Sequence, residues 1–225
     1  MMKTLCVAVV VLGLTSVCQP APLVCEKLQK RVEKSPDLSG RWHCIAFSTE
    51  FCVATTIMNA IYWPSVAVDF ISKDTPNIYT VNTKFKMYGY CRNESTSDRQ
   101  SGYKNNTVFD VDSNDAPTSK PMVLLQSGCP DCIVLKEDVN AVNAVMLFSR
   151  RQNVSAAELK EFAIQAECLG LTNPQVLNTD HDYQNCLRED DISNAYMNEV
   201  MLKGLERLKT KVLDIMKCIP PQFRF

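Results

Sequence analysis

Between residues 40 and 149, short runs rich in β-branched and aromatic residues alternate with turn-forming segments, and this alternation constrains the fold most strongly. Residues 66–71 form one run, bounded by Pro64 and by the turn sequence 73–76. Within residues 79–87, apolar and polar side chains alternate. A period of two is typical of a strand with one buried face.

Further runs cover residues 93–104, which form the weakest of them, and residues 107–111, 122–125, 133–135 and 144–148. With the run after Trp42, they make about eight strands. No helical pattern is recognised between them, which argues against βαβ units. The sequence therefore predicts a mainly β domain, an antiparallel sandwich or barrel.

Helical patterns are recognised only after these runs. Residues 155–158 form a capping box, and apolar residues then recur at helical spacing as far as Cys168. A second helix carries an apolar stripe, and its segment 203–217 has five basic and two acidic residues. The stripe consists of Met201, Leu205, Leu208, Val212 and Ile215. Packing on its own domain, self-association and shallow attachment to a lipid surface are all open interpretations.

The N-terminus predicts a secretory signal peptide, residues 1–18. Lys3 precedes an apolar segment, residues 5–12, that is too short for a bilayer span of about 20 residues. The expected cut follows Cys18, although a cut after Ser16 would retain that cysteine. The predicted organisation is a barrel domain with its helix over residues 19–187 and an amphipathic helical extension over 188–225.

Composition supports an extracellular glycoprotein. The formal net charge is −1 and no long basic block occurs, so no nucleic-acid partner is expected. Of 11 cysteines, nine follow the predicted signal peptide, and an odd number leaves at least one thiol free or bonded to another molecule. Acceptor sequons begin at Asn93, Asn105 and Asn153, which predicts N-glycosylation.

Two short motifs carry a family resemblance. Gly40, one spacer and Trp42 open the first run, and residues 147–150 (Leu-Phe-Ser-Arg) precede the capped helix. Together with the run of strands, these motifs resemble the lipocalins. The resemblance implies an eight-stranded antiparallel barrel with a C-terminal helix packed on it and a second terminal helix. It also implies that Arg150 stacks on Trp42 in a cation–π contact and that both, with Gly40, are structural.

A narrower resemblance is to the α1-acid glycoprotein group, including saxitoxin-, tetrodotoxin- and tributyltin-binding proteins of fish plasma. It rests on the sequences of residues 25–28, 158–162 and 166–169 and on the spacing from Cys168 to Cys186. It implies disulfides Cys25–Cys168 and Cys91–Cys186, a plasma location, and a toxin, organotin, steroid or lipid as ligand. The middle motif of other lipocalins, Thr-Asp-x-x-Tyr, is absent.

One cysteine pair and one acidic segment are candidates for redox or metal-binding chemistry. Cys129 and Cys132 have redox spacing, but in a turn of a secreted β protein a local disulfide is favoured, and no second pair completes a zinc site. Residues 110–114 begin like a calcium loop, but Asp115 and Pro121 replace the required glycine and glutamate. We therefore expect no metal and no cofactor.

The predicted function is reversible binding of a small hydrophobic ligand inside the barrel, without catalysis. An eight-stranded barrel has room for one small ligand. Alternation of side chains identifies the inward residues, each of which could also be ordinary core. These residues are Val66, Val68, Phe70, Tyr79, Val81, Phe85, Met87, Met122, Leu124, Met146 and Phe148.

Two alternatives stay open at this point. Cys44 shares the inner face with Trp42, while His43 faces outward. A lone thiol in the barrel resembles the arrangement in lipocalin-type prostaglandin synthase, which would make the protein a thiol-dependent isomerase that uses Cys44. Cys44 could instead be an inert thiol or pair with Cys52 or Cys218. The other alternative is an interaction or lipid-surface protein that acts through its C-terminal helix, with self-association through that helix or Cys218.

Overall fold

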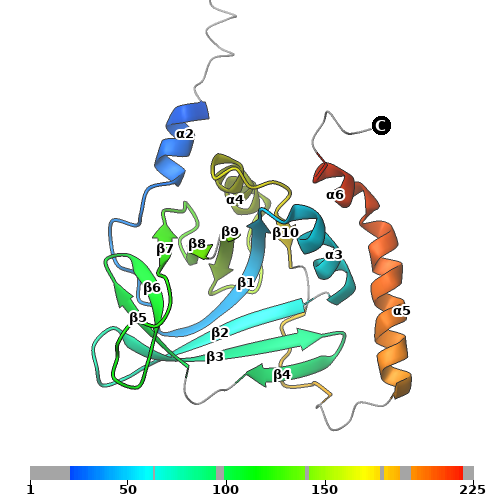
Figure 1. The fold of residues 1–225 in the computed structure, drawn as a ribbon, viewed down its shortest axis with the longest axis horizontal. Helices are drawn as coiled ribbons and strands as arrows, with labels where there is room; N and C mark the ends of the chain where they lie inside the picture. The colour runs from blue at the N-terminus through cyan, green and yellow to red at the C-terminus, as the bar shows by residue number, and fades with distance from the viewer. Residues whose placement is uncertain are drawn as a thin grey trace, which may run out of the picture.

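The computed structural model describes residues 21–62, 64–94, 99–139, 142–177, 180–187 and 194–219. One antiparallel sheet dominates the fold, with helices outside it (Figure 1). Its strands are β1 (Gly40–Thr49), β2 (Pro64–Ser72), β3 (Ile78–Met87), β4 (Tyr90–Glu94), β5 (Gln100–Lys104), β6 (Thr107–Val111), β7 (Met122–Leu125), β8 (Cys132–Val139), β9 (Val142–Ser149) and β10 (Gln175–Val176). The helices are α2 (Ala21–Leu28), α3 (Cys52–Tyr62), α4 (Ala156–Cys168), α5 (Asn194–Thr210) and α6 (Val212–Lys217).

The sheet closes into a barrel because β1 pairs with β2 on one side and with β9 on the other. β4 and β5 pair with successive parts of β3, so together they occupy one strand position. β10 pairs with β1 beyond the point where β1 leaves β2. With β10 set aside, eight strand positions surround the barrel, and the predicted fold class is confirmed.

A bulge in β1 sets which side chains face inward. The register with β9 shifts between Cys44 and Ala46, so Ile45 and Ala46 both belong to the outer apolar cluster under α4. Trp42, Cys44 and Phe47 pack in the inner cluster instead. The bulge therefore restores the inward direction of Phe47 after an extra residue.

Helix α4 covers one outer face of the barrel. Its Ser155 cap accepts a hydrogen bond from the Glu158 backbone N–H, and both parts of the capping box are present. Phe162 and Ala166 bury the apolar side of α4 against the barrel. Cys168 bonds Cys25, which ties this helix to α2.

The absence of helices among the strands was a wrong prediction, because α3 lies between β1 and β2. Its buried residues Cys52, Thr56, Asn59 and Ala60 recur at helical spacing, but two of them are polar. Its exposed positions include Met58. Polar residues inside and apolar residues outside conceal the helical pattern.

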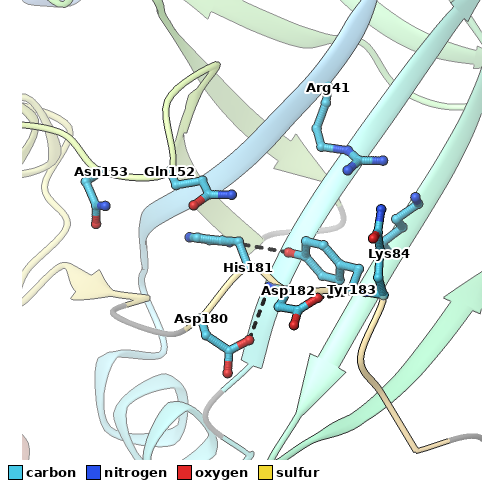
Figure 2. Close-up of a pocket in the computed structure, with 9 residues that line it drawn as sticks. Arg41, Lys84, Gln152, Asn153, Asp180, His181, Asp182 and Tyr183 are labelled. Carbon is cyan, nitrogen blue, oxygen red and sulfur yellow. Dashed lines mark hydrogen bonds between the residues drawn. The ribbon is translucent and has the colours of Figure 1, made fainter.

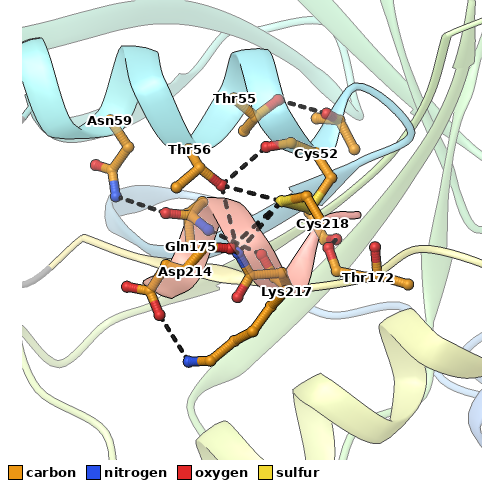
Figure 3. Close-up of a disulfide and its surroundings, with 12 residues drawn as sticks. Cys52, Thr55, Thr56, Asn59, Thr172, Gln175, Asp214, Lys217 and Cys218 are labelled. Atoms are coloured by element: carbon orange, nitrogen blue, oxygen red, sulfur yellow. Dashed lines mark hydrogen bonds and ion pairs between the residues drawn. A yellow bond between two sulfur atoms is a disulfide. The ribbon is translucent and has the colours of Figure 1, made fainter. Parts of the chain in front are cut away.

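Helices α5 and α6 pack on α3 rather than directly over the barrel wall (Figure 1). Gly204 permits the close approach, because a Cβ at this position would lie 2.8 Å from the carbonyl oxygen of Ile61. The Cys52–Cys218 disulfide links the first turn of α3 to the end of α6 (Figure 3). The predicted signal peptide lies outside the described residues, and the boundary at residue 188 stays a prediction.

Candidate ligand-binding site

The closed end of the barrel is built around Trp42. The Arg150 guanidinium lies 4.1 Å from the centre of the Trp42 ring, and the indole Nε1–H donates to the Leu38 carbonyl at 2.8 Å. Arg150 Nη2 donates to the Asp37 carbonyl at 3.0 Å. Gly40 has φ of +90°, and a Cβ there would lie 2.7 Å from Arg150 Nη1, so this position requires glycine.

Five of the predicted inward residues are buried above this floor. They form one apolar cluster with Trp42 and Cys44, and the rings of Phe70 and Tyr79 meet edge to face at 5.8 Å. Burial of the whole set makes the closed half a packed core. The five residues are Phe70, Tyr79, Val81, Leu124 and Phe148.

The other predicted residues of the inner wall are only half-buried. Val66, Val68, Met122 and Met146 pack against the inner cluster. Phe85 and Met87 continue the same face of β3 and are half-buried, but they lie outside that cluster.

Strand β2 shows that solvent reaches the inner wall at this level. Its outward residues Ser65 and Ala67 are 1% and 0% exposed, whereas its inward residues Val66 and Val68 are half-buried. In a filled barrel the inner positions would be the more deeply buried ones. The inner wall at Val66 and Val68 therefore borders unfilled space.

Several inner-wall residues were not predicted as ligand contacts. Tyr103, Val108, Ile133 and Leu135 belong to the inner cluster. Ile133 and Leu135 lie in a run that had been recognised as a strand, and alternation could have identified them. Tyr103 lies in the weaker run, where glycine and polar neighbours conceal the period.

A polar row also faces the interior. Ser101 pairs with Tyr79 on one side and Asp110 on the other, and its Oγ donates to Asp110 Oδ1 at 3.2 Å. Arg99 Nε lies 3.6 Å from the same carboxylate oxygen. Burial raises the pKa of the Tyr79 hydroxyl, so this hydroxyl keeps its proton at neutral pH. The row offers both donors and acceptors to a polar ligand group.

Comparison with known proteins agrees with this geometry. Residues 80–190 match the family model of the ApoM domain, a domain of the lipocalin family. The match spans strands β3 to β10, and the closed barrel with its Trp42–Arg150 floor completes the architecture. The chain has a lipocalin fold.

Similar solved structures include a siderocalin and an odorant-binding protein. The siderocalin Ex-FABP, described as functioning through dual ligand specificities, is 14% identical, with a TM-score of 0.49, over 64% of this chain and 95% of that chain. Odorant Binding Protein OBP1 is 15% identical, with a TM-score of 0.49, over 68% of this chain and 99% of that chain. No curated protein matches the chain in sequence.

Inside the lipocalin barrel, Cys44 is the free cysteine of the described residues. Its side chain is buried in the inner cluster, and burial raises the pKa of the thiol to about 12. The sulfur is therefore a neutral thiol at physiological pH, and a neutral thiol is a poor nucleophile.

Four disulfides among the described residues give the bonding partners of eight cysteines. Cys25–Cys168, Cys91–Cys186 and the local Cys129–Cys132 are bonded in the structure. Cys52 pairs with Cys218, a pairing that the sequence left open. Because Cys218 is bonded within the chain, self-association through it is not available in this structure.

A polar pocket of about 600 Å³ lies outside the lipocalin barrel, between β1, β3 and the segment 180–184 (Figure 2). Its charges are largely paired: Arg41 donates to both Asp69 carboxylate oxygens at 2.6 and 2.7 Å. Lys86 Nζ contacts Asp180 and donates to the Asp182 carbonyl at 2.9 Å. The Lys86 contacts therefore serve mainly to hold the segment 180–184 against the barrel wall.

Two histidine side chains are in contact where this segment lies on the barrel wall: His43 comes from β1 and His181 from the segment itself. The rings of His43 and His181 are 4.6 Å apart, and His43 is 5% exposed. Burial, His181 and Arg41 lower the pKa of His43 to about 4, and burial also lowers the pKa of His181. Ser65 Oγ lies 3.0 Å from His181 Nδ1, but its burial removes it from contact with any substrate.

The structure describes the side chains of two of the three predicted glycosylation sites. Asn105 is exposed in the turn between β5 and β6, and Asn153 is exposed just before α4. Asn93 lies in β4, and its side chain is outside the described part. The described residues contain no cluster of three or more metal-ligating side chains and no helix long and apolar enough to span a membrane.

Proposed function

We propose that the protein is a secreted, N-glycosylated carrier that reversibly binds a small hydrophobic or amphipathic molecule in its barrel. The observation that carries this proposal is the inverted burial of β2, whose inward Val66 and Val68 are more exposed than its outward neighbours. Unfilled apolar wall favours a ligand, because burial of apolar surface contributes about 25 cal/mol per Å² before the costs of binding.

The proposed site would recognise an amphipathic shape. The apolar body of the ligand would contact Val66, Val68 and the two methionines Met122 and Met146, whose flexible side chains adapt to varied surfaces. Its polar end would contact the row that includes Ser101 and Asp110, since a few polar groups usually fix orientation in an apolar pocket.

The narrower resemblance suggests a toxin, an organotin, a steroid or a lipid as ligand, in plasma. An organotin would prefer sulfur, but Cys218 is bonded and the Cys44 thiol keeps its proton. The chemistry of this barrel therefore supports apolar contact better than thiolate coordination. The same protonated thiol argues against the isomerase alternative, which needs an ionised Cys44.

Two variants of one strand would test the proposed site. N-phenyl-1-naphthylamine, a neutral fluorescent probe, should bind the native protein saturably, with one site per chain. Val68→Gln on the inner face of β2 should weaken binding about tenfold, because it places a polar amide against the ligand. Ile71→Gln on the outer face, where Ile71 is 52% exposed, should leave binding unchanged. Equal affinity for Val68→Gln and the native protein would overturn the proposal.

A further inference from the structure

The α5–α6 helices turn their polar side toward the protein and their apolar side toward solvent. Arg207, Lys211 and Asp214 line a pocket of about 700 Å³ between these helices, β10 and α4. The exposed apolar residues are Met201 (64%), Leu202 (63%), Leu205 (47%), Val212 (54%), Leu213 (76%) and Met216 (37%). A surface helix normally buries its apolar side, so this orientation is reversed.

The exposed apolar residues continue onto α3. Ile57 of α3 lines a groove of about 570 Å³ together with five apolar residues of α5 and α6. These five residues are Leu202, Leu205, Leu208, Val212 and Ile215. We call the groove and the exposed apolar residues of α5 and α6 the helical apolar surface. A contiguous apolar surface, here formed by three helices, is typical of an interaction site.

Several specific contacts hold the helices in this orientation. The missing side chain of Gly204 lets α5 approach the Ile61 carbonyl, and Cys218 bonds Cys52. Asn173 Nδ2 donates to the Asp214 carbonyl at 2.9 Å, which fixes α6 beside β10. The outward direction of the apolar side is therefore built into the fold.

Charge indicates what covers the surface. Most basic residues of segment 203–217 are engaged elsewhere: Lys211 and Lys217 pair with Asp214, and Lys203 pairs with Glu199. Lys209 lies on the groove itself, beside Glu206. A second copy of the chain would bury the exposed Lys209 in an apolar interface, whereas at a lipid surface its stem can lie among apolar groups while its ammonium reaches anionic headgroups.

We propose that the helical apolar surface docks on a lipid surface that carries anionic headgroups. Met201, Leu202 and Leu213 would enter the boundary between headgroups and acyl chains, and Lys209 would lie among the headgroups. This inference does not depend on the proposed ligand site in the barrel.

Docking would also bring the open end of the barrel close to lipid. Helix α3 joins the end of β1 to the start of β2, and the Tyr88 hydroxyl donates to the Ala60 carbonyl at 3.2 Å, so α3 spans the rim. A hydrophobic ligand could then pass between lipid and barrel without crossing much water.

Flotation with vesicles tests the inference on the full-length secreted protein. Native protein should float with vesicles of phosphatidylcholine plus phosphatidylserine, and less with phosphatidylcholine alone or at high salt. Leu213→Glu should lower the partition coefficient about tenfold or more, and Lys209→Gln about fivefold on the anionic vesicles only. Ile71→Glu, an equally polar change at an exposed residue of β2, serves as the matched control and should float like the native protein.

Three results would overturn the inference. One is a native protein that does not float with anionic vesicles. Another is equal flotation of Leu213→Glu and Ile71→Glu. The third is a native dimer in sedimentation that Leu213→Glu converts to monomer without any vesicle binding, which would make the surface an interface between copies. Probe binding in the barrel is measured on the same variants and should be unchanged in all of them.

Discussion

The two ends of the barrel use the same strands for different purposes. At the closed end, Trp42 lies between its Leu38 hydrogen bond and the Arg150 guanidinium, and the inward residues above it are buried. Nearer the open end, the inward residues Phe85 and Met146 are only half-buried. The difference teaches that alternation along a strand identifies the inner wall but does not separate core from ligand contact.

The largest loss of stability should come from replacing Trp42 at the closed end of the barrel. Trp42→Ala should lower the free energy of unfolding by about 3–5 kcal/mol, because it leaves a cavity and an unstacked arginine. Phe85→Ala, at a half-buried position of the open half, should cost about 1–2 kcal/mol. Urea denaturation of both variants measures the difference, and equal losses would contradict the contrast between the two ends.

The Cys52–Cys218 disulfide comes next in size. Replacing both cysteines with serine should cost about 2–4 kcal/mol, since the bond closes a long loop with a sequence separation of 166. It should also expose α5 and α6 to trypsin. The matched control is the Cys129–Cys132 pair, with a sequence separation of 3, whose replacement should cost less. Thermal unfolding gives both values, and a larger loss for the short loop would refute this account of the rim.

Acid should weaken the outer side of the closed half. The unfolded chain protonates His43 near pH 6.5, but the folded protein does so only at about pH 4. Stability that is complete above pH 6.5 should therefore fall between pH 6.5 and 4, by up to about 3 kcal/mol. His43→Phe should flatten this part of the pH profile in urea denaturation. The same slope in both proteins would show that His43 does not titrate as described.

Arg150 should have the smallest effect. Arg150→Lys should cost about 1 kcal/mol, because lysine keeps the charge but loses the flat stacking on Trp42 and the bond to the Asp37 carbonyl. Arg31→Lys, at an exposed position near the same end, should change stability very little. Equal stability of Arg150→Lys and the native protein would mean that the stacking contributes nothing measurable.

The sequence patterns were sufficient for the antiparallel strands and for helix α4 because both rest on local patterns. Alternation in residues 79–87 and the capping box before α4 depend on neighbouring residues alone. The family resemblance added the long-range stack of Arg150 on Trp42, which spacing could not supply. Nine of the eleven predicted ligand contacts also lie in or against one inner cluster, although contact with a ligand stays a prediction.

The parts that sequence did not predict depend on tertiary context. Helix α3 buries Thr56 and Asn59 and exposes Met58, so its apolar pattern is misleading. The pairing of Cys52 with Cys218 needs the position of α6 on α3, and no spacing rule gives that position. The apolar stripe of α5 was visible, but its outward direction follows from Gly204 and the disulfide.

The location of ligand binding is best tested by NMR with ¹³C-methyl methionine. Met122 and Met146 line the open half of the barrel, whereas Met58, Met201 and Met216 are exposed on the helices. Saturating N-phenyl-1-naphthylamine should shift the methyl signals of Met122 and Met146 and leave the three helical signals in place. Shifts confined to Met201 and Met216 would place the ligand on the helical apolar surface and contradict a carrier barrel.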